Sequence, residues 1–472
     1  MFSKINTILV TIDAYVWGIP LIVLILSVGL FLTIRLKGVQ FTNLGRAFKY
    51  IFKDETDGKH GEVSSFAALC TALSATIGTG NIVGVATAIV SGGPGALFWM
   101  WLAALVGTAT KYAECLLAVK FRQVDEDGHV VGGPFNYIEH GMGPKWKWLA
   151  KIFAFFGIGV GLLGIGTFTQ VNGISSAVNN FFDSNNAWTV SLFGRTYSWT
   201  VVISCLILTF CVALVLIGGI QRISKVAQVI VPFMAATYFL AGILIILFNI
   251  TDVPAAILTI VQSAFGLKAA AGGALGAMVV AMQKGIARGI FSNEAGLGSA
   301  PIAAAAAKTK EPVRQGLVTM TGTFIDTIIV CTLTGLSIVM MGSYQVKGIE
   351  GVQVTTEAFQ KGLHFLPGEV SAFILMICLV FFAFTTILGW DYYGERCLEY
   401  LTNRNKNAVK VYRWLYILAV FIGPYMTVTA VWTIADIFNG LMAIPNIIAL
   451  FALSGIVAKE TREYFKEKRH KL

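Results

Sequence analysis

Charge is scarce in this chain of 472 residues. Asp, Glu, Lys and Arg make up 13% of the sequence, about half the share found in soluble globular proteins. Hydrophobic residues make up 56%, which is more apolar surface than the core of one soluble protein can bury. The composition therefore excludes a soluble globular protein and predicts an all-α integral membrane protein.

The common catalytic motifs are also missing. The sequence has no G-x-x-x-x-G-K-[ST] phosphate loop, no H-E-x-x-H metal motif and no G-x-S-x-G nucleophile motif. The pattern Gly159-x-Gly161-x-x-Gly164 resembles a dinucleotide fingerprint, but it lies inside an apolar span with no strand before it. We interpret these glycines as helix packing, and we expect no enzyme.

Neither cysteine nor histidine is arranged for a metal or redox centre. The seven cysteines lie almost wholly in apolar stretches and include no C-x-x-C pair, so we interpret them as free, buried side chains. The five histidines fall in loops or in the C-terminal tail. This distribution argues against a metal centre inside the membrane.

Long apolar segments are abundant, and we predict eleven membrane spans. The first covers 13–36 and has no A-x-A-like cleavage site, which indicates a retained helix rather than a signal peptide. Residues 253–270 are expected to form a partial helix on the outer surface. The other ten predicted spans are 64–90, 95–119, 150–180, 200–219, 228–250, 275–306, 316–342, 370–400, 411–431 and 434–458.

The basic residues predict the orientation, because cytoplasmic loops retain Lys and Arg. With the loop 37–63 inside, the inner segments and the C-terminal tail hold 27 of the 35 Lys and Arg residues, whereas the outer segments hold five. We therefore expect the N terminus outside and the C terminus in the cytoplasm. The net charge of +10 then reflects topology and a match to anionic lipid, not a nucleic-acid partner.

Two polar, glycine-containing stretches interrupt spans that are otherwise apolar. They are Ser74-Ala-Thr-Ile-Gly-Thr-Gly-Asn-Ile-Val-Gly84 and Phe291-Ser-Asn-Glu-Ala-Gly-Leu-Gly298. Glycine, Thr and Asn disfavour helix, so both helices are expected to open. Freed backbone groups in hydrocarbon need partners, which predicts a ligand site at the middle of the membrane.

The two breaks also suggest an internal duplication. Gly78 and Asn293 are 215 residues apart, and the polar positions Thr169 and Thr385 are 216 apart. Because a unit of five helices is odd, the second copy is expected to be inverted in the membrane. The predicted divisions are an extra span and loop at 1–63, two five-helix repeats at 64–250 and 251–458, and a basic cytoplasmic tail at 459–472.

Opened half-helices suit a small zwitterion. Their free N–H groups favour a carboxylate and their free carbonyls favour a cation. Bulky residues beside the polar positions, Phe168, Phe291 and Trp390, are candidates to wall a small pocket. The oxygens of Ser74, Ile77, Thr385 and Thr386 are candidates for sodium, and those of Thr76, Asn81 and Asp326 for a second cation cluster.

Each of these sequence features also has a simpler structural interpretation. Gly80-x-x-x-Gly84 is also a helix-packing spacing, and Thr385 and Thr386 can bond back to their own helix. The membrane carboxylates Asp326, Asp436 and Glu294 can pair with neighbours, and Lys111 with Glu114 is expected to be a structural pair. Lys284 and Arg288 are either interfacial anchors or a gate pair with an acidic partner.

Four stretches resemble the alanine or glycine:cation symporter family over nearly the whole chain. They are Gly78-Thr-Gly-Asn-Ile-Val-Gly-Val-Ala-Thr-Ala-Ile89, Gly92-Gly-Pro-Gly-Ala-Leu-Phe-Trp-Met100, Gly289-Ile-Phe-Ser-Asn-Glu-Ala-Gly-Leu-Gly-Ser-Ala-Pro301 and Ala443-Ile-Pro-Asn446. The resemblance implies a LeuT-type 5+5 inverted-repeat core with one extra N-terminal span, in a prokaryotic plasma membrane. By the same resemblance, the residues that hold the amino acid would be Thr79, Gly80, Asn81, Gln170, Phe291, Ser292, Asn293 and Trp390.

The resulting hypothesis is a sodium-coupled symporter that imports a small neutral amino acid by alternating access. Alanine is the expected substrate, with glycine or D-alanine also considered, sodium is the co-transported ion, and a monomer is expected. The alternatives are proton coupling, a glutamine-preferring substrate range, an amino-acid sensor, or a passive channel.

Overall fold

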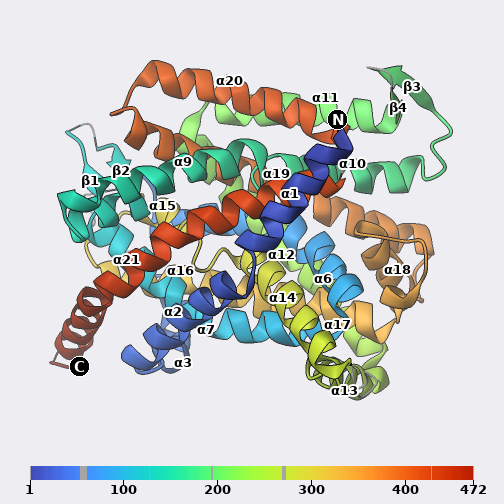
Figure 1. Cartoon of the computed structure of the whole chain (residues 1–472), viewed down its shortest axis with the longest axis horizontal. Helices are drawn as coiled ribbons and strands as arrows, with labels where there is room; N and C mark the ends of the chain where they lie inside the picture. The colour runs from blue at the N-terminus through green and yellow to red at the C-terminus, as the bar shows by residue number, and fades with distance from the viewer. Residues whose placement is uncertain are drawn as a thin grey trace.

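The computed structural model describes residues 2–53, 61–126, 128–192, 195–267, 273–426 and 428–470, and it is nearly all helical. The helices run across the molecule as a bundle. The C terminus and the β1–β2 hairpin lie at one end, and the β3–β4 hairpin and α18 lie at the other (Figure 1). The main helices are α7 (Gly95–Lys120), α11 (Trp199–Leu216), α12 (Gly219–Phe248), α14 (Ala274–Asn293), α16 (Pro312–Thr323), α17 (Thr332–Met340), α19 (Gly368–Leu401), α20 (Lys406–Ile422) and α21 (Val428–His470).

Within the described residues, nine helical stretches are long and apolar enough to cross a membrane. The broken pair formed by Ser65–Thr76 and Gly80–Gly92, bent by 49°, adds a tenth. Helix α20 has 17 residues and is not among these ten stretches. The all-helical membrane fold is thus confirmed, while the count of eleven spans stays a prediction.

The N-terminal span expected at 13–36 corresponds to Thr7–Arg35, one of the nine stretches, but it is not one continuous helix. It forms two helices, α1 (Phe2–Val16) and α2 (Ile19–Arg35), separated at Trp17 and Gly18, and Pro20 lies in the first turn of α2. Pro favours a helix start because it lacks the N–H that would bond to a preceding turn. The Trp17 indole donates to the carbonyl of Asp436 at 2.7 Å, so this segment is tied to α21.

The predicted span 150–180 is also interrupted. Helix α9 (Lys147–Leu163) ends at Gly164, and α10 (Phe168–Phe182) begins four residues later. Hydropathy alone did not reveal this break. Its cause is local, because two glycines with low helix propensity, Gly164 and Gly166, lie between the helices.

Three further segments refine the expected layout. Helix α13 (Val253–Ala264) confirms the short helix expected within 253–270. Helix α18 (Val352–Gly362) lies between the predicted spans 316–342 and 370–400, where no helix was predicted. Helix α21 continues to His470, so the expected basic tail is helical over its described residues. The loop 37–63 contains α3 (Val39–Thr42) and α4 (Leu44–Ile51), and α4 buries Ala47 and Ile51.

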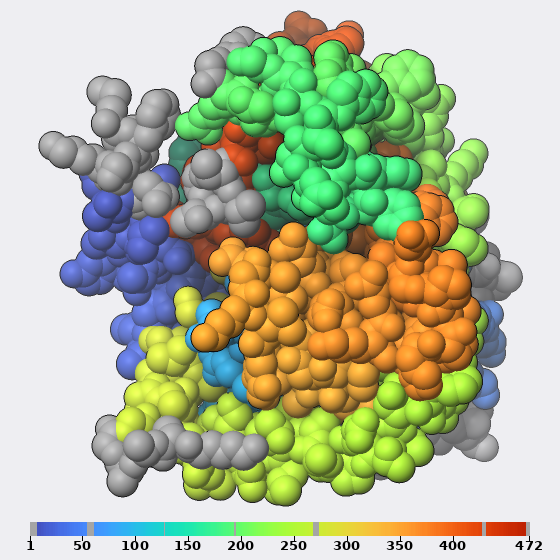
Figure 2. Space-filling view, turned by 90° about the vertical axis from the view of Figure 1, so that its right-hand side faces the viewer, coloured from blue at the N-terminus to red at the C-terminus, as the bar shows by residue number. Residues whose placement is uncertain are grey.

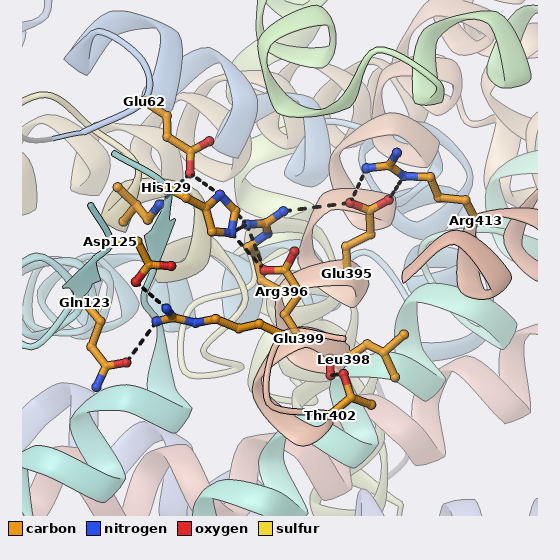
Figure 3. Close-up of polar contacts among 12 residues, drawn as sticks. Glu62, Gln123, Asp125, His129, Glu395, Arg396, Leu398, Glu399, Thr402 and Arg413 are labelled. Carbon is orange, nitrogen blue, oxygen red and sulfur yellow. Dashed lines mark hydrogen bonds and ion pairs between the residues drawn. The ribbon is translucent and has the colours of Figure 1, made fainter. Parts of the chain in front are cut away.

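Two small hairpins complete the fold. Strands β1 (Gln123–Val124) and β2 (Val130–Val131) pair antiparallel, as do β3 (Thr189–Leu192) and β4 (Arg195–Ser198). Just before β2, His129 lies in an ionic cluster with the C-terminal part of α19 (Figure 3). Its ring nitrogens lie 3.2 Å from an oxygen of Glu62 and 3.1 Å from an oxygen of Glu399.

This cluster changes the acidity of its loop members. The hydrogen bonds with Glu399 and Glu62 raise the pKa of His129 to about 9, against the opposing effects of burial and of the Arg396 guanidinium. Burial acts to raise the pKa of Glu62, but hydrogen bonds from His129 and from the N–H of Val130 outweigh it and leave this pKa below its usual value. The loop is therefore held by a charged imidazolium between two carboxylates.

The cluster should make stability depend on pH in one direction. Because the pKa of His129 rises on folding from the ordinary 6.5 to about 9, its contribution is fully present below pH 6.5 and is lost as the pH rises through 9. We expect the Tm of the purified protein to fall between these values, and His129→Gln to reduce that fall. His364→Gln, a surface histidine outside the cluster, is the control. An unchanged pH dependence in His129→Gln would contradict this role.

Candidate functional site

The first break lies between α5 (Ser65–Thr76) and the π-helical turn Gly80–Gly84, which continues into α6 (Val85–Gly92). Side chains satisfy the backbone groups that the opening frees. The N–H of Gly78 donates to Oδ1 of Asn81 at 2.9 Å, and the N–H of Thr79 donates to Oε1 of Gln170 at 3.0 Å. Gln170 thus holds the break from α10, while its expected contact with an amino acid stays a prediction.

The second break lies at the end of α14, before α15 (Ala300–Ala305). Glu294 adopts the left-handed conformation with φ of 57°, which stops the helix. The side chain of Asn293 accepts from the N–H of Ala295 at 2.9 Å and donates to the hydroxyl of Thr327 at 3.0 Å. Both predicted openings are confirmed, and both are buried.

The two breaks contact each other. A Cβ added to Gly80 would lie 3.2 Å from Cα of Ser292 and 3.3 Å from the ring of Phe291. A larger residue at this position would force Ser292 and Phe291 to shift by a few tenths of an ångström, so glycine favours this close approach. The packing interpretation of Gly80 and the binding interpretation are compatible, because the packing is what brings the breaks together.

Asp326 joins the two breaks through its carboxylate. It lies in the π-helical segment Phe324–Cys331 between α16 and α17. Its oxygens accept from the Asn81 amide at 2.7 Å and from the Ser292 hydroxyl at 2.9 Å. Thr327 also donates to it, at 2.8 Å. Helical π-turns of this kind are often found at functional sites.

The sequence analysis missed two members of this cluster. The thiol of Cys331 lies 3.4 Å from the Asn81 amide nitrogen and 3.3 Å from the Ser292 hydroxyl. Cysteine was interpreted as apolar filling, and nothing in a single sequence separates this thiol from the other six. Thr327 could have been found, because it is a polar neighbour of Asp326 inside an apolar stretch.

The structure divides the residues predicted for sodium into two groups. The Thr386 hydroxyl lies 3.2 Å from the carbonyl oxygen of Ile77, and a Cβ on Gly78 would come within 2.5 Å of that hydroxyl. The Thr386 hydroxyl also bonds back to the carbonyl of Phe382 in its own helix, at 2.9 Å. Among the described residues, the hydroxyls of Ser74, Thr76 and Thr385 donate only to carbonyls of their own helices or lie near a sulfur. Thr386 and Ile77 thus bring oxygens together at the first break. The back-bonding considered for Thr385 and Thr386 is observed for both.

The predicted pocket walls are likewise divided. The Phe291 ring packs on Trp432 with centroids 4.9 Å apart. The Trp390 indole donates to Oε1 of Glu294 at 2.8 Å, next to the second break. Phe168 packs with Ala419 and Val431, on the side of α20 and α21. Phe168 thus packs toward α20 and α21 at the start of α10, two residues before Gln170.

A buried polar network fixes the second break from behind. Glu114 of α7 accepts from the N–H of Gly296 at 3.1 Å and from the Asn446 amide at 2.5 Å. Asn446 also donates to the carbonyl of Gly296 at 2.9 Å. Lys111 is the nearby positive charge for Glu114 and Glu294. Its ammonium makes no hydrogen bond among the described residues, so the expected direct pair with Glu114 is not observed. One side of the site is thus held by α7 and α21.

Arg288 has an acidic partner. Its guanidinium donates to both carboxylate oxygens of Asp436, at 2.9 and 2.7 Å, and lies over the Trp432 ring at 4.6 Å. Lys284 is exposed, as an interfacial anchor would be. Arg288 thus has the acidic partner that the gate-pair alternative requires, and its role as a gate stays a prediction.

A cavity leads from this ion pair toward the surface. It measures about 570 Å³, and its walls include Val83 next to the first break, Thr169 of α10, and Arg288 with Trp432. Figure 2 shows this face, where the surface that follows α10, in green, meets the surface of α18, in orange. The cavity thus extends from the surface to Val83, in the π-helical turn that follows the first break. Among the described residues, no group of three His, Cys, Asp or Glu side chains could hold a metal ion.

Comparison with known proteins agrees with this geometry. The chain is 54% identical over 98% of its length to an uncharacterised transporter of Haemophilus influenzae, 96% of which is covered. It is 45% identical to the sodium/alanine symporter AgcS of Methanococcus maripaludis, over 96% of each chain.

A solved structure has the same architecture. The crystal structure of MhsT in complex with L-phenylalanine has a TM-score of 0.59, at 13% identity, over 84% of this chain and 90% of that one. This likeness confirms the expected LeuT-type fold. Residues 2–472 match the sodium:alanine symporter family, and the expected multi-pass transporter of a prokaryotic cell membrane is confirmed with it. The chain belongs to the sodium:alanine symporter family.

Proposed function

We propose that this protein is a sodium-coupled symporter that imports a small neutral amino acid, with alanine as its main substrate. The contact of the two breaks, bridged by Asp326, carries the proposal. Helix ends that meet at one buried point offer N–H groups to a carboxylate and carbonyls to cations. The residues proposed to hold the amino acid are Thr79, Gly80, Asn81, Gln170, Phe291, Ser292, Asn293 and Trp390, with Phe168 as an outer wall.

The close approach of Gly80 to Ser292 supports a short substrate side chain. With Cα of Ser292 only 3.2 Å from where a Cβ on Gly80 would be, little room remains between the breaks. A glutamine-preferring substrate range is the alternative, and competition measurements distinguish it from an alanine preference. Labelled alanine uptake into proteoliposomes, challenged with glycine, D-alanine and glutamine, separates these substrates.

Sodium is proposed to bind where Thr386 reaches Ile77. An oxygen-rich point beside the opened turn suits a hard cation, and sodium bound there would order the turn that holds the amino acid. Affinities for the two ligands must then depend on each other reciprocally. Ser74 and Thr385 complete the proposed site if their hydroxyls leave their own helices, and Thr76, Asn81 and Asp326 form the proposed second cluster.

Alternating access is proposed to move one bundle of helices against the other around this site. The repeats 64–250 and 251–458 would be the inverted halves, with the N terminus outside, the C terminus in the cytoplasm and one chain as the working unit. The Arg288–Asp436 ion pair is the proposed outer contact that breaks and re-forms in each cycle.

Counterflow in proteoliposomes tests this function against its rivals. Sodium-dependent accumulation of labelled alanine against its gradient would exclude a sensor and a passive channel. Accumulation driven by a proton gradient in the absence of sodium would show that the coupling ion is the proton. A leak that ignores both gradients would overturn symport.

Thr386→Ala is expected to raise the sodium concentration needed for half-maximal uptake by about tenfold, since an ion ligand contributes on the order of 1–3 kcal/mol. Uptake at saturating sodium should fall much less. The measurement is alanine uptake against sodium concentration. Ser337→Ala is the matched control, because this buried hydroxyl also donates to its own helix, at 2.7 Å from the carbonyl of Leu333. An unchanged sodium requirement in Thr386→Ala would remove Thr386 from the site.

Asp326→Asn is expected to lower the efficiency of alanine uptake by about 10- to 100-fold, because charge-assisted hydrogen bonds to both breaks are weakened. Asp252→Asn, an exposed carboxylate in the segment before α13, should transport normally. Both variants are compared by initial uptake rate per folded protein, with folding judged from size-exclusion profiles. Wild-type uptake by Asp326→Asn would refute the bridge between the breaks.

A further inference from the structure

A second cavity lies far from the breaks, between the end of α2 and the end of α21. It measures about 700 Å³ and is bounded by α2, α3, α4 and the last turns of α21. In Figure 1 the C terminus and α3 occupy the same corner of the molecule. We call this cavity the basic groove, and its cationic side chains are Arg35, Lys37, Arg46, Arg462, Lys466 and Lys468.

Contacts across the groove hold its two sides together without neutralising them. The Arg35 guanidinium lies 5.5 Å from the centre of the Phe31 ring, and that ring lies 5.4 Å from the ring of Phe451 on α21. Arg46 of α4 lies 5.1 Å from the centre of the Phe465 ring. These cations rest on aromatic faces, so their charge is positioned rather than cancelled.

The groove has no carboxylate of its own. Among the described residues, Lys468 pairs with Glu311 at 3.4 Å, whereas the other five cations have no ion pair. Near the end of α21, Glu460 bonds Lys120 at 2.7 Å and Glu463 lies 3.9 Å from Lys459. Glu467, the third carboxylate there, is exposed and is not among the residues that line the groove. Cations gathered without counter-charge repel one another unless an anion lies between them.

The pattern on α21 places its cations on one face. Ala458, Thr461, Arg462, Phe465 and Lys466 all line the groove, with the spacing of three and four residues that marks one side of a helix. Ala458 and Phe465 add an apolar floor beneath Arg462 and Lys466. The groove therefore combines a cationic rim with an apolar base.

The outer wall of the groove continues into the membrane. On α2, Leu30 is 53% exposed and Ile34 is 70% exposed, within two turns of Arg35. Phe41 of α3 is 59% exposed. An occupant with an anionic head and hydrocarbon chains can therefore place its head among the cations and its chains along Leu30 and Ile34. A soluble anion would contact the cations but not the exposed apolar side chains.

We propose that the basic groove is a binding site for the phosphate headgroup of an anionic phospholipid. Basic cavities between spanning helices at the membrane surface bind such headgroups. The Arg and Lys side chains supply hydrogen bonds and charge to the phosphodiester, and the apolar side chains supply contact for the acyl chains. The lipid joins α2 and α4 to the end of α21, so it links the extra N-terminal segment to the last helix.

Native mass spectrometry of the full-length protein in detergent tests the site. The probes are a phosphatidylglycerol and a phosphatidylcholine with identical acyl chains. We expect the wild-type protein to retain one phosphatidylglycerol in preference to phosphatidylcholine. The double variant R462Q/K466Q should bind phosphatidylglycerol about tenfold more weakly, since each cation at an anionic headgroup contributes measurably to affinity.

The matched control is K406Q/K410Q. These two lysines are also exposed and one turn apart, but they lie on α20, outside the groove. Their replacement should leave phosphatidylglycerol binding within about twofold of wild type, as expected for diffuse surface charge. If R462Q/K466Q fails to fold, R46Q tests the opposite wall from α4.

Three results would overturn the proposal. They are equal retention of the two lipids by the wild-type protein, equal loss of phosphatidylglycerol in R462Q/K466Q and K406Q/K410Q, and displacement of the lipid by inorganic phosphate at physiological concentration. The last result would assign the groove to a soluble anion. Because binding is measured directly, its failure leaves the proposed transport function untouched.

Discussion

The constraint that shapes this protein is that backbone polar groups inside a membrane must have partners. At the first break, side chains from other elements supply them. Asn81 and Gln170 accept from the N–H groups of Gly78 and Thr79, and the Thr386 hydroxyl lies 3.2 Å from the carbonyl oxygen of Ile77. Gln170 lies on α10 and Thr386 on α19, whereas Asn81 belongs to the turn that follows the break. Opening the helix therefore requires the surrounding bundle to be assembled.

The second break meets the same requirement in a different way. Glu114 and Asn446 hold the backbone of Gly296 from α7 and α21. Glu294 receives bonds from Trp390 at 2.8 Å and Ser299 at 2.5 Å. Asp326 then contacts both breaks through Asn81 and Ser292. A cluster with so many shared members is expected to respond as a unit when one member changes.

The sequence predicted the features that depend on composition and local propensity. The two openings were predicted from Gly, Thr and Asn at 78–81 and from the polar run at 291–298. Both openings are present. Asp326 was conspicuous as a carboxylate in an apolar segment. The sequence could not show features set by tertiary contact. Examples are the interruption at 164–167, the part played by Cys331, and the packing of Phe168 against Ala419 and Val431.

The Arg288–Asp436 pair has a consequence for tolerance of ionic strength. Dissolved salt weakens attractions between charges that water surrounds, with a screening length of about 10 Å at 0.1 M. Here the two side chains are 13% and 11% exposed, and aromatic rings cover the guanidinium. The pair is therefore screened less by dissolved salt than a fully exposed ion pair would be, and salt reaches it mainly through the cavity that Arg288 lines.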